Sequence, residues 1–187
     1  MNIKKYLTAA IMVIILAALD QFTKYLIIEN VELHKEIPVI GNAVVITHIH
    51  NSGAAWGKFS GMIPVLLVIT IIISVAICYI YHNIVDENKY LPIRVCLVLI
   101  MGGAIGNMID RIRFKYVTDF IYFKIINFPV FNVADIFVTV SVFVLIFLFI
   151  LKYKSEDMDR ILGENKKSQK EKREDISEDK SEEENTK

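Results

Sequence analysis

The 187-residue chain has few of the side chains that most enzymes use for metal or nucleophilic chemistry. It contains two cysteines, Cys78 and Cys96, and four histidines. The cysteines lie inside apolar runs without the C-x-x-C spacing of a redox or zinc site, so we interpret them as small buried apolar residues. His48 and His50 alternate along a predicted strand, but no third ligand lies at metal-binding spacing. We therefore expect neither a metal nor another cofactor.

Other familiar signals are also missing. The glycines of 102–106 (GGAIG) lie within an apolar run and indicate close helix packing, not a phosphate-binding loop. Neither Ser52 nor Ser60 lies in a nucleophile-elbow motif. There is no broad basic face with interleaved aromatic residues, which argues against a nucleic-acid partner.

Apolar residues are abundant and concentrated in runs. They make up 54% of the chain, and the mean hydropathy is +0.45. A helix that spans a bilayer needs about 20 mostly apolar residues. Four segments approach that length, and they predict a mainly α membrane protein with four transmembrane helices at about 6–28, 62–81, 91–109 and 133–151.

The N-terminus is similar to a signal peptide, because Lys4 and Lys5 precede the apolar run Tyr6–Leu19. However, Asp20 and Gln21 follow where small residues would form a cleavage site. The sequence then becomes apolar again, so we predict a retained first span that carries polar groups near one end.

The segments between the spans lie alternately on two sides of the membrane. Segment 29–61 contains the β-branched run Ala43–Ile49, which predicts a strand, with Ile37–Ile40 as a partner that turns at Gly41-Asn42. An open sheet edge cannot face lipid. We therefore expect a small β-sheet on the membrane surface, on the same side as segment 110–132.

An even number of spans places both termini on one side, but charge does not say which. Lys and Arg near the span ends number six on each side: Lys4, Lys5, Lys89, Arg94, Lys152 and Lys154 against Lys35, Lys58, Arg111, Arg113, Lys115 and Lys124. The remaining charge lies mostly in the C-terminal tail. We expect a four-span domain over 1–152 and a charged, disordered tail or fraying helix over 153–187.

Polar residues at membrane depth are costly, and here they gather at one level. The topology brings together residues from three spans and two connecting segments: Asp20 and Lys24, Asn51, Asn107, Asp110 and Arg111, Asp119, and Asn132 and Asp135. All of them are expected at the same face of the membrane.

Asp119 and Asp135 are candidates for a catalytic pair. Two carboxylates held close together share one proton, so that one can activate water while the other polarises a carbonyl. Apolar neighbours favour a protonated Asp119, whereas a helix N-terminus favours a charged Asp135. The same residues also allow a plainer interpretation, in which Asp135 and Asn132 cap a helix and Asp119 is a loop acid.

The other charged residues also have structural interpretations. Asp20 and Lys24, one helical turn apart, can form a salt bridge that reduces the cost of burying two charges, and we favour this role for Lys24. Asp110 can form an ion pair with Arg111 that closes the third span. A non-enzymatic alternative is a proton or solute pathway, but the other halves of spans two and four are apolar.

Five motifs together resemble those of the lipoprotein signal peptidases, or signal peptidase II. They occur in the family's order within residues 6–152: 20–24 (DQFTK), 51–56 (NSGAAW), 106–111 (GNMIDR), 117–121 (VTDFI) and 131–135 (FNVAD). An intramembrane aspartic protease of the presenilin kind is disfavoured, because its Gly-x-Gly-Asp motif is missing. Trp56 stands where the signal peptidase family more often has Phe.

The resemblance implies a bacterial membrane aspartic peptidase that cleaves prolipoproteins before a cysteine carrying diacylglycerol. Asp119 and Asp135 would be catalytic. The residues that bind substrate or shape the site would be Asp20, Asn51, Gly53, Asn107, Arg111 and Asn132. Both termini would be cytoplasmic, with the active site and the small sheet outside the cytoplasmic membrane. The implied partners are diacylglyceryl-modified prolipoproteins, membrane lipid and globomycin-type inhibitors.

Overall fold

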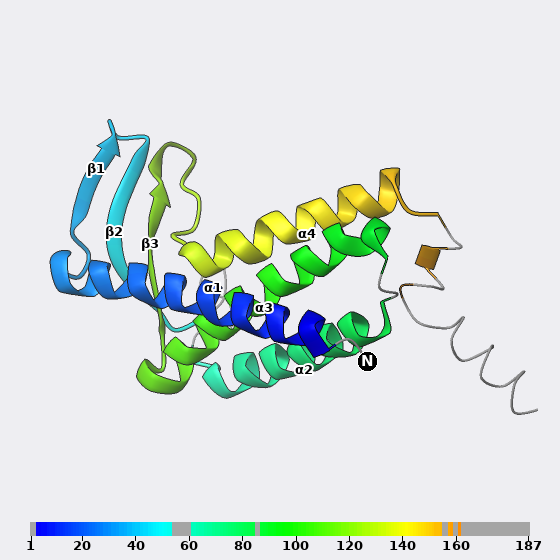
Figure 1. The fold of residues 1–187 in the computed structure, drawn as a ribbon. Helices are drawn as coiled ribbons and strands as arrows, with labels where there is room; N and C mark the ends of the chain where they lie inside the picture. The colour runs from blue at the N-terminus through cyan, green and yellow to red at the C-terminus, as the bar shows by residue number, and fades with distance from the viewer. Residues whose placement is uncertain (1–2, 54–60, 85–86, 155–156, 159–160, 162–187) are drawn as a thin grey trace, which may run out of the picture.

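The fold is a bundle of four long helices with a small sheet at one end (Figure 1). The computed structural model describes residues 3–53, 61–84, 87–154, 157–158 and 161. The elements in chain order are α1 Ile3–Asn30, β1 Glu36–Ile40, β2 Val44–Asn51, α2 Ile63–Asn83, the 3-10 helix η2 Asn88–Tyr90, α3 Leu91–Phe114, β3 Val117–Phe123, the 3-10 helix η3 Lys124–Ile126, and α4 Val133–Leu151.

All four long helices are long and apolar enough to cross a membrane. Much of their apolar surface faces outward, as Ile72 on α2 and Phe143 on α4 illustrate with 62% and 68% of their surface exposed. Such exposure would be unfavourable in water, and lipid removes that cost. The chain is therefore a multi-pass membrane protein, as the apolar runs predicted.

Helix α3 lies at the centre of the bundle and packs against each of the other three helices. Small residues allow this close approach. A Cβ added at Gly102 would lie 2.6 Å from the Leu16 Cβ of α1, and one at Gly103 would lie 2.5 Å from the Ala134 carbonyl oxygen of α4. The predicted role of these glycines in helix packing is confirmed.

Helix α3 continues five residues past its predicted end at Ile109, so Asp110 and Arg111 lie within the helix. Ile112 and Phe114 prolong the apolar pattern, and the helix ends where Lys115 adopts a left-handed conformation with φ of 66°. This extra turn and a half carries Asp110 and Arg111 inward, against the sheet.

The sheet has three antiparallel strands in the order β1-β2-β3. The β1–β2 hairpin turns at Gly41-Asn42 as predicted, with Gly41 at φ of +51°. The third strand was not predicted, since segment 110–132 was treated as a loop. Residues Val117–Phe120 are all buried, so this strand lacks the alternation of apolar and polar residues that identifies most strands.

A second cluster closes the opposite end of the bundle. Tyr153 and Ile161, from the start of the charged tail, pack with Tyr90 and Ile93. Asp157 accepts a hydrogen bond of 2.8 Å from the Tyr90 hydroxyl and forms an ion pair with Lys89. These first tail residues are therefore packed, which the predicted disorder did not anticipate. Most of the tail, including 162–187, lies outside the described residues.

The two cysteines differ in their surroundings. Cys96 is buried, as predicted, but Cys78 is exposed on α2. The apolar run around Cys78 does not distinguish a side chain that faces a neighbouring helix from one that faces lipid, because both environments are apolar. The expectation of burial was therefore wrong for Cys78.

The packing at Gly103 generates a stability prediction. We expect Gly103→Ala to lower the unfolding free energy by about 1–3 kcal/mol, because the new methyl group would force α3 away from the backbone of α4. Thermal unfolding in detergent measures the effect. Val95→Ala, at an outward-facing position of the same helix that is 49% exposed, is the control. Equal midpoints for the two variants would contradict the proposed close packing.

Candidate active site

Asp119 is held inside the protein by two asparagine side chains. It lies on β3 with 2% of its surface exposed. Asn51 at the end of β2 donates its amide to Oδ2 at 2.7 Å, and Asn132 donates to Oδ1 at 2.6 Å. Each carboxylate oxygen therefore has one donor. Asp119 is a buried strand residue, so its interpretation as a surface loop acid was wrong.

Asp135 is both a helix cap and a member of the site. Its backbone N–H donates to Asn132 Oδ1, and its Oδ2 accepts from the Asn132 backbone N–H, each at 3.1 Å. The two residues thus form a capping box at the start of α4. Asp135 Oδ1 also accepts a bond of 2.8 Å from the Asn107 amide. The capping interpretation is confirmed, and it coexists with the second contact.

Asn132 links the two acids. It is fully buried, and its amide group donates to Asp119 and to Asn107, at 2.6 and 3.1 Å. Its backbone N–H and side-chain oxygen are bonded to Asp135. One asparagine therefore fixes the position of the strand carboxylate relative to the helix carboxylate.

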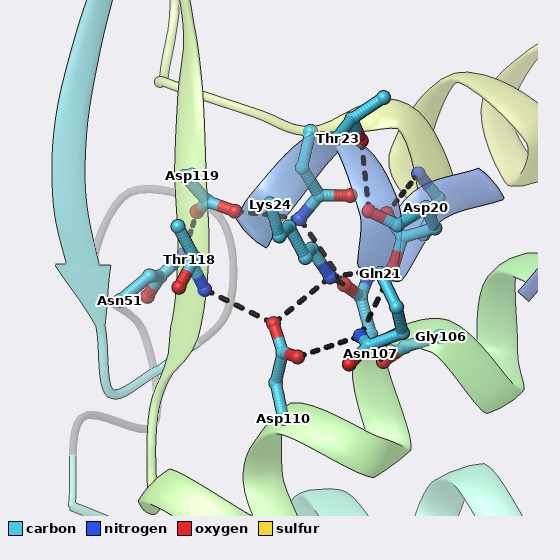
Figure 2. A network of polar contacts seen from close by, with 12 residues as sticks. Asp20, Gln21, Thr23, Lys24, Asn51, Gly106, Asn107, Asp110, Thr118 and Asp119 are labelled. Carbon is cyan, nitrogen blue, oxygen red and sulfur yellow. Dashed lines mark hydrogen bonds and ion pairs between the residues drawn. The ribbon is translucent and has the colours of Figure 1, made fainter. Parts of the chain in front are cut away.

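A buried cation, Lys24, lies at the centre of the neighbouring polar network (Figure 2). Lys24 Nζ lies 2.8 Å from Asp20, 2.9 Å from Asp110 and 2.8 Å from Asn107 Oδ1. The predicted Asp20–Lys24 salt bridge is confirmed. Among the described residues, the ion pair of Asp110 is with Lys24, and not with the adjacent Arg111 as predicted from the sequence. Helix α1 supplies a cation that the local sequence around Asp110 could not reveal.

The carboxylates that hold Lys24 also bind the backbone of other elements. Asp20 Oδ1 accepts from the Ala134 N–H on α4 at 3.0 Å, and Asp110 Oδ2 accepts from the Thr118 N–H on β3 at 3.2 Å. Gln21 donates to Asp110 at 2.7 Å and to the Gly106 carbonyl at 3.1 Å. Sequence reasoning did not assign roles to Gln21 or Thr118. Gln21 follows Asp20 directly in the motif, which is the one signal that could have identified it.

A cavity of about 390 Å³ opens beside the two acids. Asp119 and Asp135 both line it. Four other predicted site residues also lie in its wall: Asn51, Gly53, Asn107 and Arg111. The rest of the wall is mostly apolar and consists of Thr70, Ile73, Ile100, Gly103, Ala104, Val117, Phe128, Pro129, Val130, Phe131, Val138 and Thr139. Asp20 and Asn132 lie behind this wall. Asn51 and Gly53 were the residues of the 51–56 motif predicted in the site; Ala54, Ala55 and Trp56 of the same motif lie outside the described residues.

Burial changes the acidity of Asp119. Desolvation by burial, together with the nearby charge of Asp135, raises its pKa from 3.8 to about 7. The hydrogen bonds from Asn51 and Asn132 oppose this rise. A carboxyl with this pKa can hold a proton near neutral pH. With a second carboxylate lining the same cavity, the site can present both a proton acceptor and a proton donor to a bound polar group.

No group of three or more His, Cys, Asp or Glu among the described residues is arranged to hold a metal ion. The carboxylates of Asp119 and Asp135 accept hydrogen bonds from asparagine side chains, and those of Asp20 and Asp110 form ion pairs with Lys24.

Comparison with known proteins adds independent findings. Residues 12–151 match the family model described as signal peptidase (SPase) II. Several curated relatives are named "Lipoprotein signal peptidase". The one from Lactococcus lactis subsp. lactis is 40% identical over 81% of this chain and 97% of the relative. The one from Moorella thermoacetica is 36% identical over 72% of this chain and 87% of the relative. A solved bacterial membrane enzyme is 34% identical, with a TM-score of 0.71 over 79% of this chain and 92% of that one.

The buried Lys24 generates a prediction. Lys24→Met should lower the unfolding free energy by about 3–5 kcal/mol, because Asp20 and Asp110 would keep their burial and lose their cation. Chemical denaturation in detergent measures this change. Lys35→Met is the matched control, since Lys35 is 52% exposed and forms a longer contact of 3.7 Å with Glu32. That control should cost less than about 1 kcal/mol. Equal costs would contradict the role of Lys24.

The raised pKa of Asp119 generates another prediction. Between pH 3.8 and about 7 the folded state holds a proton that the unfolded state has released, so stability should decrease as pH rises through this window. Infrared titration of the protonated carboxyl band, assigned with Asp119→Asn, should show proton loss near pH 7. In Asp135→Asn the titration should move to lower pH, because one cause of the shift is removed. An Asp119 band that titrates near pH 4 would refute the assignment.

Proposed function

Because the chain belongs to the signal peptidase II family, we propose that Asp119 and Asp135 are the catalytic pair of this peptidase. Family membership makes the protein an aspartic endopeptidase of the membrane that removes signal peptides from prolipoproteins. The observation that carries the residue assignment is Asn132, which binds both carboxylates at the wall of one cavity.

The pair would share one proton. Asp119, with its raised pKa, holds this proton near neutral pH, and Asp135 is the charged partner at the N-terminus of α4. Asp135 accepts a proton from water as the water oxygen attacks the scissile carbonyl carbon. Asp119 donates its proton to the carbonyl oxygen, which gives a neutral tetrahedral intermediate.

Collapse of that intermediate completes the hydrolysis. The proton taken by Asp135 passes to the leaving amide nitrogen as the carbon–nitrogen bond breaks. Asp119 recovers a proton from the intermediate as the carbonyl of the released signal peptide re-forms. The pair again shares one proton, and one water has been consumed.

Other wall residues would hold the peptide. Arg111 is half-buried at the cavity, and its Nε has no hydrogen-bond partner among the described residues. We assign it to a carbonyl of the substrate backbone. Asn51, whose Oδ1 accepts from the Gly53 N–H at 3.0 Å, fixes the neighbouring part of the wall. Asn107 and Asp20 act as positioning residues for Asp135 and the start of α4.

The substrate we propose is a prolipoprotein whose cysteine carries diacylglycerol, cut just before that cysteine. A lipid anchor keeps the scissile bond near the membrane surface, and the acids lie at the sheet end of the helices. The apolar cavity wall suits acyl chains or an apolar signal peptide. In this proposal the termini are cytoplasmic, the sheet end is extracytoplasmic, and globomycin-type inhibitors occupy the cavity.

The direct test uses purified protein and a diacylated prolipoprotein, with and without globomycin. We expect Asp119→Asn and Asp135→Asn each to lower cleavage by at least about a hundred-fold, as expected for loss of a positioned acid or base. Release of the signal peptide is measured on gels or by mass spectrometry.

Glu32→Gln is the matched control for exchanging a carboxylate for an amide. Its side chain is 83% exposed, and it should retain full activity. Near-normal cleavage by either Asp variant would overturn the catalytic assignment, and would leave family membership unaffected.

A further inference from the structure

The end of the sheet formed by the β1–β2 turn and η3 exposes large apolar side chains outside the membrane-spanning helices, and one of them, Phe128, also lines the edge of the cavity. Ile125 and Ile126 on η3 are 76% and 68% exposed, and Val39 and Ile40 on β1 are 58% and 64% exposed. Phe123 and Phe128 are also exposed. We call these six residues the apolar tip.

Backbone hydrogen bonds and one ring contact join the two turns that carry these residues. The Ala43 N–H donates to the Ile40 carbonyl, and the Ala43 carbonyl accepts from the Lys124 N–H, at 2.9 and 3.0 Å. These bonds join the β1–β2 turn to η3. The rings of Phe123 and Phe128 lie 6.4 Å apart. The apolar tip is therefore one surface formed by two turns.

An apolar surface of this kind in water would be unfavourable and would favour aggregation. The fold places this surface next to the lipid bilayer. The sheet contacts the ends of α1 and α3, which cross the membrane. In Figure 1 the strands run across the direction of the helices, and the β1–β2 turn projects past the first turn of α4. The turn therefore extends sideways over the bilayer surface.

We propose that the apolar tip inserts into the head-group and upper acyl region of the leaflet on the sheet side. Its backbone suits this position, because the Asn127 and Phe128 N–H groups donate to the Lys124 and Phe123 carbonyls, at 3.1 and 3.2 Å. Polar backbone groups satisfied within the turn make entry into the interface inexpensive. Exposed Ile and Phe side chains supply the apolar area that binds it.

The insertion should be shallow. β1 is an edge strand, and its outer backbone groups need water or lipid head groups. The Lys124–Glu36 ion pair, at 2.5 Å and about two-fifths exposed, also belongs at the level of the head groups. The inserted tip would thus hold the sheet, and with it Asn51 and Asp119, at a fixed depth relative to the membrane surface. This proposal rests on the membrane spans and does not depend on the catalytic assignment.

Tryptophan quenching by brominated phosphatidylcholine tests the insertion. The single tryptophan, Trp56, is replaced by Phe, and one reporter is introduced at Ile125→Trp or, as a second variant on the other turn, Ile40→Trp. The full chain is reconstituted into vesicles whose acyl chains carry bromine near the head group or near the methyl end. Glu32→Trp, at an exposed charged position near the end of α1, is the matched control.

We expect both tip reporters to lose most of their fluorescence to bromine near the head group and less to bromine near the methyl end. Glu32→Trp should be quenched weakly by both lipids. Tip reporters that are quenched no more than this control would overturn the proposal. So would quenching that appears only when a brominated lipopeptide substrate is added, because the tip would then bind substrate. A third outcome would also overturn the proposal: protection of the tip reporters from quenching that depends on the protein-to-lipid ratio, together with energy transfer between labelled copies. The tip would then be a contact between two copies of the chain.

Discussion

The site depends on a single buried ammonium group. Lys24 joins two carboxylates and one amide, and each of those three groups in turn fixes another element: Asp20 binds the first turn of α4, Asp110 binds β3, and Asn107 binds Asp135. A charge at this depth is costly unless it is paired and hydrogen-bonded. Because every contact of Lys24 satisfies that requirement, the same interactions that offset its burial also determine where the helices and the strand meet.

Asn107 shows how this constraint reaches the acids. Its oxygen accepts from Lys24 and from Asn132, so its amide nitrogen is left to donate to Asp135. An amide flip would place a donor against the ammonium group. Lys24 therefore sets the orientation of Asn107, although its own hydrogen bond and ion pairs are with Asn107, Asp20 and Asp110 and not with Asp119 or Asp135. The division between a structural residue and a functional one is not sharp in this network, and the capping box of Asp135 illustrates the same point.

Much of the architecture followed from the sequence, and the reasons are physical. Runs of about 20 apolar residues have few stable arrangements other than a membrane span. Gly41-Asn42 between β-branched segments specifies a hairpin turn. The third strand escaped prediction because β3 is buried along Val117–Phe120 and so lacks a period of two. The ion-pair partner of Asp110 was not predicted, because Lys24 is far away in the chain and Arg111 is the adjacent cation in the sequence.

The sequence by itself determined the four spans, the hairpin, the gathering of polar residues at one membrane face and the motifs of the family. These properties depend on periodicity, on apolar length and on local residue order. Only the tertiary structure decided that Asp119 is a buried strand residue, that Asn132 binds both acids, and that two turns form one exposed apolar tip. Each of these depends on contacts between segments distant in the chain, whose geometry is set by packing and not by any local pattern.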